Sequence, residues 1–224
     1  MNPKCLVFDF DYTLAFFRDG LGFLELFVSA GMRRQEVDSL FTEIVQSPEG
    51  FTIRRMLDAA SSVDSFDQRE RLRIAYAFRI WLERSLELYP DVLRCIEWAL
   101  TAGIPWVIVT AGDDSYQRQK ISALGLAGLV PADVFVTPPA HGKAEALREL
   151  IARFGRPIWF VDDSPHELDR VRAAGLSQDD VATFLLVRSD SLYTQVSPRH
   201  PHTSITSLDE LRGREGVSHA HSGS

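Results

Sequence analysis

A short stretch near the start of the chain, residues 5–14, constrains the fold more than any other. Residues 5–8 (CLVF) form an uninterrupted apolar run, which is the pattern of a strand buried on both faces of a parallel sheet. Asp9 and Asp11 follow at the end of this run. Both carboxylates are therefore expected at the carboxyl edge of the sheet, where open α/β folds bind their ligands.

Two carboxylates this close together favour a bound cation, because like charges repel each other. One aspartate could act as nucleophile and metal ligand and the other as proton donor, which would make the site a phosphoryl-transfer centre. A turn that is rich in aspartate and has no chemical role is the alternative. The residues at the other strand ends decide between the two.

Composition limits the class of partner. The chain has 224 residues, 45% of them hydrophobic, which is enough for one domain with a large insertion or for two small domains. Its formal net charge of −7 argues against a nucleic acid or an anionic membrane as the main partner. No apolar run approaches the ~20 residues of a membrane helix, and no signal peptide precedes the first strand. Because Cys5 and Cys95 have the pattern of buried thiols, we expect a cytoplasmic protein.

Residues 16–89 show helical periodicity without a strand pattern, which predicts an inserted helical unit. Four helices are expected: residues 21–30, residues 36–45, one that begins at Ser47 and Pro48, and one that begins with a capping box of Ser65 and Gln68 and runs to about Leu88. The last of these is apolar around much of its circumference, so it could support a cap or a dimer interface.

From residue 90 onward helices and strands alternate, which predicts a parallel sheet of βαβ units. The expected strands are residues 106–109, 134–136, 158–161 and 183–187, and the expected helices are residues 91–102, one ending at 124, 144–154, 165–174 and 207–211. The predicted domains are thus a core of residues 1–15 and 90–213, a cap of residues 16–89 and a disordered tail of residues 214–224.

Two groups of residues at later strand ends are suited to binding an anion. Thr110, Ala111 and Gly112 offer a hydroxyl, a backbone N–H and a glycine that lets a phosphate approach closely. Lys143 lies at a helix start, where a cation opposes the helix dipole, so an anionic partner explains its position better than helix stability does. A solvated surface lysine is the alternative.

Asp162 and Asp163 end another strand and bring the number of expected carboxylates at this sheet edge to four. Four acids at one edge require a divalent cation. Ser164 and Glu167 also match the N-cap and third position of a capping box, so helix capping competes with a metal role for Glu167.

These motifs resemble, in order, the four motifs of the haloacid dehalogenase-like (HAD) hydrolase superfamily, in its capped phosphatase type. They are FDFDYTL at 8–14, VTAG at 109–112, Lys143, and VDDS at 161–164. The first and fourth are specific, whereas the second and third are weak alone. The resemblance implies an α/β fold, with a Rossmann-like parallel sheet, helices on both faces and an inserted all-helical cap.

The resemblance also implies roles for individual residues. Asp9 would attack phosphorus to give an aspartyl-phosphate, and Asp11 would protonate the leaving alcohol and then activate water. Thr110 and the amides of Ala111 and Gly112 would hold the phosphoryl oxygens. Lys143 would offset the charge on Asp9 and the phosphate.

A magnesium ion is implied as the cofactor. Asp9, Asp11 and Asp163 would bind Mg²⁺, and Asp162 would assist as a ligand or orienter. Asp162 stands where many capped members have glycine, and Glu167 where they commonly have aspartate, so the division of roles around the metal stays open. Asp163 is the safer ligand.

We therefore expect a Mg²⁺-dependent phosphatase that acts on a small phosphorylated metabolite, as a monomer or homodimer. Asp11 favours a phosphate substrate, because the haloalkanoate dehalogenases of the superfamily lack an acid at that position. A phosphomutase of the same superfamily and a non-catalytic binding protein on the same fold are the alternatives. The cap is expected to set the substrate, and Arg18, Arg54, Arg55 and Arg79 could clamp a second anionic group, although helix-surface arginines are usually only solvated.

Overall fold

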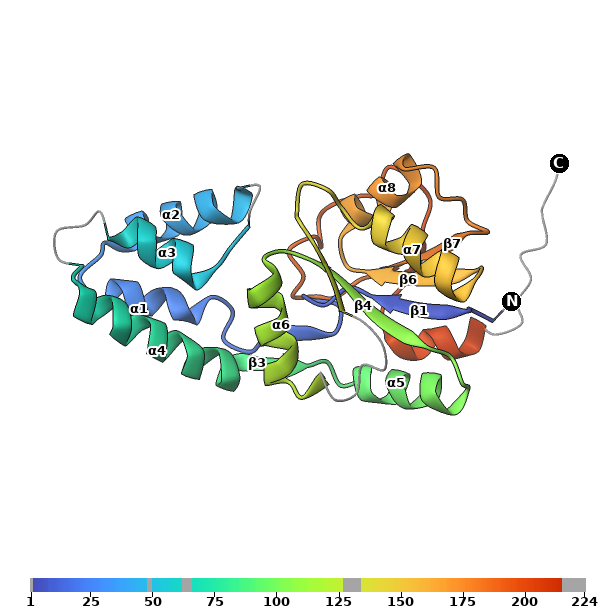
Figure 1. Cartoon of the computed structure of the whole chain (residues 1–224), viewed down its shortest axis with the longest axis horizontal. Helices are drawn as coiled ribbons and strands as arrows, with labels where there is room; N and C mark the ends of the chain where they lie inside the picture. Colours follow the sequence, from blue (N-terminus) through green and yellow to red (C-terminus); the bar gives the residue numbers. More distant parts are fainter. Residues whose placement is uncertain (1, 48–49, 62–65, 127–133, 215–224) are drawn as a thin grey trace.

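Six parallel strands form the central sheet, and five of them coincide with apolar runs in the sequence (Figure 1). They are β1 (Cys5–Phe8), β4 (Trp106–Ala111), β5 (Val134–Thr137), β6 (Ile158–Asp162), β7 (Val181–Leu186) and β8 (Thr203–Ile205). Their order is β5-β4-β1-β6-β7-β8, so β1 lies between β4 and β6. The computed structural model describes residues 2–47, 50–61, 66–126 and 134–214.

The side chains of β1 alternate between two hydrophobic cores, one on each face of the sheet. Leu6 and Phe8 enter the first, which is covered by α5 (Val92–Thr101), α6 (Asp114–Ala123) and the 3₁₀ helix η3 (Leu208–Arg214). Cys5 and Val7 enter the second, which is covered by α7 (Ala144–Phe154) and α8 (Pro165–Ala173). Since β1 is buried on both faces, its run of apolar residues is explained, and the predicted parallel sheet with helices on both faces is confirmed.

The helical insertion lies beyond the carboxyl end of β1 (Figure 1). It comprises the 3₁₀ helix η1 (Gly22–Leu24), α1 (Glu25–Val28), α2 (Arg34–Gln46), α3 (Ile53–Ala60) and α4 (Gln68–Ser85). These helices bury a third hydrophobic core, which includes Phe27, Met56 and Phe78. The predicted helical cap is therefore confirmed. No helix among the described residues is long and apolar enough to cross a membrane.

Two short strands connect the insertion to the core, and the sequence analysis missed both. β2 (Ala15–Phe17) pairs antiparallel with β3 (Leu86–Leu88). The prediction that the last cap helix runs to about Leu88 is therefore wrong, because α4 ends at Ser85 and the chain becomes extended at Leu86. Pairing with β2, which is far away in the sequence, outweighs the local helical pattern.

Several helix ends in the insertion also differ from the prediction. Residues 21–30 form a 3₁₀ turn and the four-residue α1 instead of one helix. Ser47 ends α2, and the N-cap of α3 is Thr52, whose side chain accepts a hydrogen bond from the Arg55 N–H. Asp67 caps α4 in the same way. Pro48, the predicted first residue of the third helix, lies outside the described residues, as do the predicted N-cap Ser65 and residues 215–224 of the predicted tail.

Asp91 joins three parts of the core. Its carboxylate accepts hydrogen bonds from the Arg188 guanidinium at 2.8 and 3.0 Å, the Ser207 hydroxyl at 3.0 Å and the Leu208 N–H at 2.8 Å. Burial would raise the pKa of Asp91, but these hydrogen bonds outweigh it and hold the pKa below its usual value. Arg188 also lies 4.0 Å from the centre of the Tyr89 ring. Asp91 thus stabilises the segment after β7 and the start of η3 against α5.

Replacing Asp91 by alanine should lower the free energy of unfolding by about 3–5 kcal/mol, because it leaves the Arg188 guanidinium buried without its carboxylate. Denaturant unfolding would measure this. The matched control is Asp209→Ala, which removes an exposed pair with Arg94 and should cost at most about 1 kcal/mol. Equal effects of the two substitutions would contradict the structural role of Asp91.

Candidate active site

The turn after β1 directs Asp9 and Asp11 to the carboxyl edge of the sheet. Phe10 and Leu14 anchor this turn because both are fully buried, and the Leu14 N–H donates to the Phe10 carbonyl at 2.9 Å. Tyr12, between them, has a φ of 57°, a left-handed conformation that is uncommon for a residue other than glycine. Such strain is typical of functional sites.

The end of β6 lies beside this turn because β1 and β6 are neighbouring strands. The Asp9 N–H donates to the Val161 carbonyl at 2.9 Å, and the Asp163 N–H donates to the Thr13 hydroxyl at 3.2 Å. These bonds bring Asp9, Asp162 and Asp163 together. Each of the three offers a carboxylate oxygen within 4.8 Å of the others, and all three side chains are buried.

Lys143, at the start of α7, supplies the positive charge in this group. Its Nζ donates to Asp9 Oδ1 at 2.5 Å and to Asp162 Oδ2 at 2.7 Å, and only 2% of the side chain is exposed. Burial would lower the pKa of Lys143, but the Asp162 and Asp9 carboxylates raise it above its usual value. Lys143 is therefore a buried ammonium ion between two carboxylates, and not a solvated surface lysine.

Three carboxylates share this one ammonium, so negative charge is in excess. Burial raises the pKa of Asp9, and the Lys143 charge offsets this only in part. Burial also raises the pKa of Asp162 and Asp163, with the charges of neighbouring aspartates adding to the effect. A further cation would restore the balance.

The donor set fits a divalent cation such as Mg²⁺, which prefers carboxylate oxygens. Both oxygens of Asp162 accept hydrogen bonds from the protein, one from Lys143 and one from the Ser164 N–H. This arrangement suits an orienting residue. Asp163 Oδ2 accepts a 2.5 Å hydrogen bond from the Ser191 hydroxyl, which holds that carboxylate in place. Asp9 and Asp163 are accordingly the best-placed metal ligands.

The Asp11 carboxylate lies outside the group of three and has different partners. Lys120 Nζ lies 2.5 Å from both of its oxygens, and Gln117 Nε2 donates to Oδ2 at 3.0 Å. Lys120 is 3% exposed, whereas about a third (32%) of the Asp11 side chain is exposed. Asp11 is therefore held at the edge of the site, where it can face both a bound molecule and water.

Thr110 and Ala111 end β4 on the other side of β1, and Gly112 follows them. Thr110 is buried at the sheet edge. The Gly112 N–H donates to the Thr137 carbonyl at 2.9 Å, so this amide is engaged and does not match the predicted phosphate contact. Glycine is nevertheless required here, because φ is +147° and a Cβ would lie 2.7 Å from Gln117 Nε2.

All eight residues that the sequence analysis assigned to the site line one cavity of about 360 Å³ between core and cap. They are Asp9, Asp11, Thr110, Ala111, Gly112, Lys143, Asp162 and Asp163. Glu167 also lines it, but its carboxylate pairs with Arg170 at 2.9 Å, and only the Ser164 half of the predicted capping box forms, at 3.4 Å.

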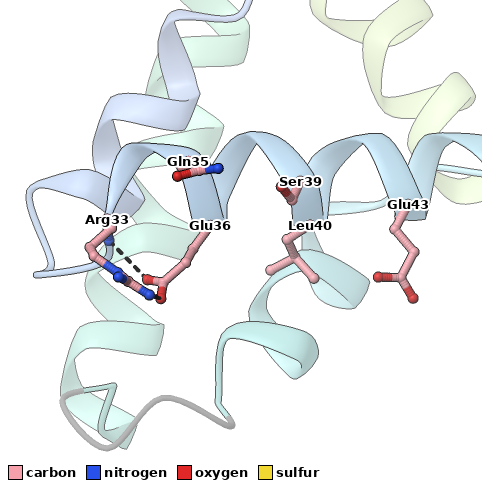
Figure 2. Close-up of a pocket in the computed structure, with 6 residues that line it drawn as sticks. All are labelled: Arg33, Gln35, Glu36, Ser39, Leu40 and Glu43. Atoms are coloured by element: carbon pink, nitrogen blue, oxygen red, sulfur yellow. Dashed lines mark hydrogen bonds and ion pairs between the residues drawn. The ribbon is translucent and has the colours of Figure 1, made fainter.

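A second hollow of about 480 Å³ lies along α2. Figure 2 shows its lining, in which Arg33 is paired with Glu36 and the side chains of Leu40 and Glu43 extend from the same helix. All six lining residues belong to α2 and its N-cap. None of them is one of the three buried aspartates, so this hollow lacks the carboxylate group that could bind a metal ion.

Three residues of the site were missed by the sequence analysis. Gln117 and Lys120 lie one turn apart on α6, and Ser191 lies after β7. A lysine and a glutamine at this spacing are ordinary features of an exposed helix face, so the local sequence carries no signal. The burial of Lys120 becomes visible only when α6 packs beside the turn after β1.

The chain resembles solved structures over nearly its whole length. A haloacid dehalogenase-like hydrolase from Burkholderia xenovorans has a TM-score of 0.70 at 19% identity, with 94% of this chain and 95% of that chain covered. A HAD phosphatase from Thermococcus onnurineus has a TM-score of 0.66 at 19% identity, with 96% and 98% covered. A Thermotoga maritima protein assigned as a β-phosphoglucomutase has a TM-score of 0.62 at 16% identity, with 93% and 96% covered.

At these identities the neighbours establish the fold and not the reaction. No curated protein matches the chain significantly. The sequence model of the haloacid dehalogenase-like hydrolases, however, matches residues 3–175, which include β1, the whole insertion and the ends of β4 and β6. The chain therefore belongs to the haloacid dehalogenase-like hydrolase family.

Proposed function

We propose that this protein is a Mg²⁺-dependent phosphatase that hydrolyses a small phosphate monoester through an aspartyl-phosphate intermediate. One observation carries the proposal: the Asp9 carboxylate is held by Lys143, beside Asp162 and Asp163, in a cavity that the cap covers. A buried carboxylate with an adjacent ammonium and a divalent-cation site is suited to attack a phosphate that its own charge would otherwise repel.

The first step uses Asp9 as the nucleophile. One of its oxygens would bond to phosphorus while the bond from phosphorus to the leaving alcohol breaks. Lys143 offsets negative charge on Asp9 and on the phosphoryl oxygens, and the Thr110 hydroxyl and the Ala111 amide are the proposed oxygen ligands. A Mg²⁺ ion held by Asp9 and Asp163 would neutralise charge on the phosphoryl group.

Asp11 is the proposed acid and base. In its protonated form it would give a proton to the leaving alcohol, and in its ionised form it would take one from the water that hydrolyses the aspartyl-phosphate. Lys120 and Gln117 hold the Asp11 side chain at the cavity wall. These two residues would therefore position Asp11 for both proton transfers.

The function is tested by a screen of phosphorylated metabolites with Asp9→Asn as the blank. We expect Mg²⁺-dependent release of inorganic phosphate, loss of turnover in EDTA, recovery with Mg²⁺ and poor substitution by Ca²⁺, whose looser coordination would misplace the phosphate. Asp9→Asn should lower turnover by at least about 10³-fold, because an amide cannot form the acyl-phosphate.

Acid-quenched wild-type enzyme should carry a phosphoryl group on the peptide that contains Asp9, detectable by mass spectrometry. Release of inorganic phosphate separates this activity from a phosphomutase, which returns the phosphoryl group to an organic product. Full activity in EDTA, or a phosphorylated Asp9→Asn enzyme, would contradict the proposal.

Lys120→Met keeps the length of the side chain but removes the cation that holds Asp11. Proton transfer is typically worth about 10²–10⁴ in rate, so a misplaced Asp11 should lower kcat by about 10-fold or more. The matched control is Arg118→Met on the outer face of α6, where the partner Asp114 is exposed. A kcat of Lys120→Met within about twofold of wild type would show that Lys120 does not position Asp11.

A further inference from the structure

The cavity between core and cap has a charged floor and apolar walls. The charged groups described above lie at the floor, at the carboxyl ends of β1, β4 and β6. The cap and its connecting strand contribute to the walls Phe17, Leu21, Phe23, Phe41, Val45, Gly50 and Phe51. Among the described residues, therefore, none that lines the cavity from this side carries a charge.

Among the described residues, the cations that line the cavity are Lys120 and Lys143, and both are already paired with carboxylates. The other charged residues of this lining, apart from the aspartates described above, are the acids Asp113 and Glu167. A second phosphate or carboxylate on the substrate would thus meet like charges.

The cap arginines considered in the sequence analysis are not part of this lining. Arg18 pairs with Glu87 and donates to the Arg84 carbonyl, Arg54 lies near Asp58, and Arg79 lies over the Tyr76 ring. Arg55 donates to the Ser47 hydroxyl and to the Gly50 carbonyl. They are therefore occupied within the cap, and the idea that they clamp a second anionic group has no support in the cavity's lining.

The aromatic walls are held in place by one another. The Phe51 ring lies 5.4 Å, between centroids, from each of Phe23, Phe41 and Tyr116, at interplanar angles of 53–69°. These are the edge-to-face distances that aromatic pairs prefer. Because Tyr116 belongs to α6 and both rings line the cavity, this contact joins the cap wall to the core.

Three exposed aliphatic side chains surround the opening. Leu21 is 42%, Val45 is 44% and Leu192 is 73% exposed, and all three line the cavity. Exposed apolar side chains that line a concave site are typical of a site that binds an apolar group. An apolar group entering from this side would remove them from water.

We propose that the substrate is the monophosphate ester of an uncharged apolar alcohol that carries about one aromatic ring, with the ring held between Phe51, Tyr116 and the rim. This inference rests on the proposed phosphatase function and names its substrate class. A volume of about 360 Å³ is at the small end for ligand sites, so it suits a phosphate with one ring system. On the cap side, the hydroxyl or base-edge groups of sugar phosphates and nucleotides would face the side chains of the wall, which offer no hydrogen-bond partner.

The test compares alkyl esters, whose leaving alcohols are chemically alike. We expect kcat/KM for 2-phenylethyl phosphate to exceed that for ethyl phosphate by about 10- to 100-fold, because the ring is buried on binding. Phosphoglycolate should be poorer than 2-phenylethyl phosphate, because its second anion would meet like charges in the cavity. Equal or better turnover of phosphoglycolate would overturn the inference.

Substitutions test whether the apolar residues that line the cavity cause the preference for the phenyl ring. Phe51→Ala should reduce the ratio of kcat/KM for 2-phenylethyl to ethyl phosphate by about 10-fold. Val45→Asn at the exposed rim should reduce the same ratio severalfold and is not expected to disturb folding. Leu72→Asn, at an exposed position of α4 outside the cavity lining, is the matched control and should not change the ratio. An unchanged ratio in Val45→Asn and in folded Phe51→Ala would contradict the assignment.

A binding measurement separates this inference from the proposed reaction. Calorimetry with 3-phenylpropylphosphonate and propylphosphonate, which cannot be hydrolysed, should show tighter binding of the phenyl compound by about 10-fold or more. The same preference without any turnover would support the pocket and contradict the phosphatase function. Turnover without a preference for the ring, in kinetics and calorimetry alike, would contradict the inference and leave the phosphatase function standing.

Discussion

The buried excess of negative charge at the carboxyl edge of the sheet is the constraint on which the rest of the site depends. Asp9, Asp162 and Asp163 bring three carboxylates together, and within the described part of the chain Lys143 is the cation that pairs with them. Burial makes each ionised carboxylate costly, so this arrangement is stable only with a further cation or with bound protons. A divalent cation both satisfies the group and provides the charge that a phosphate substrate needs. The same imbalance would thus account for both the proposed metal site and the proposed reaction.

The fold produces this concentration of charge by placing β1 between β4 and β6. Each strand is apolar until its last residues, and the polar side chains follow where the strands end. Neighbouring segments then fix these side chains, as Ser191 fixes Asp163 and Lys120 fixes Asp11. The insertion covers the same edge with carbon-rich side chains, so a substrate meets charge on one side and an apolar wall on the other.

The parts of this structure that were predictable from the sequence are those with strong local signals. The apolar run before Asp9 identified β1, and the acids and Lys143 at later element ends identified the site because parallel strands share one carboxyl edge. Features that arise from distant contacts were not predictable. Leu86–Leu88 becomes a strand only because β2 pairs with it, and Lys120 is buried only because α6 packs against the turn that carries Asp11. The hydrogen bond from the Gly112 N–H to the Thr137 carbonyl was likewise not predictable, because it depends on the register of β4 and β5. The sequence analysis therefore assigned this N–H to phosphate.

The central claim, that the three buried aspartates form a divalent-cation site, is tested most directly by titrating the apo-protein with Mg²⁺ in a calorimeter, without substrate. We expect one Mg²⁺ per chain, with a rise in melting temperature on binding that follows the ligand concentration. Asp163→Asn should lose both the binding heat and the rise in melting temperature while keeping its fold by circular dichroism. Wild-type protein that binds no Mg²⁺, or an Asp163→Asn variant that binds it as tightly as wild type, would contradict the account.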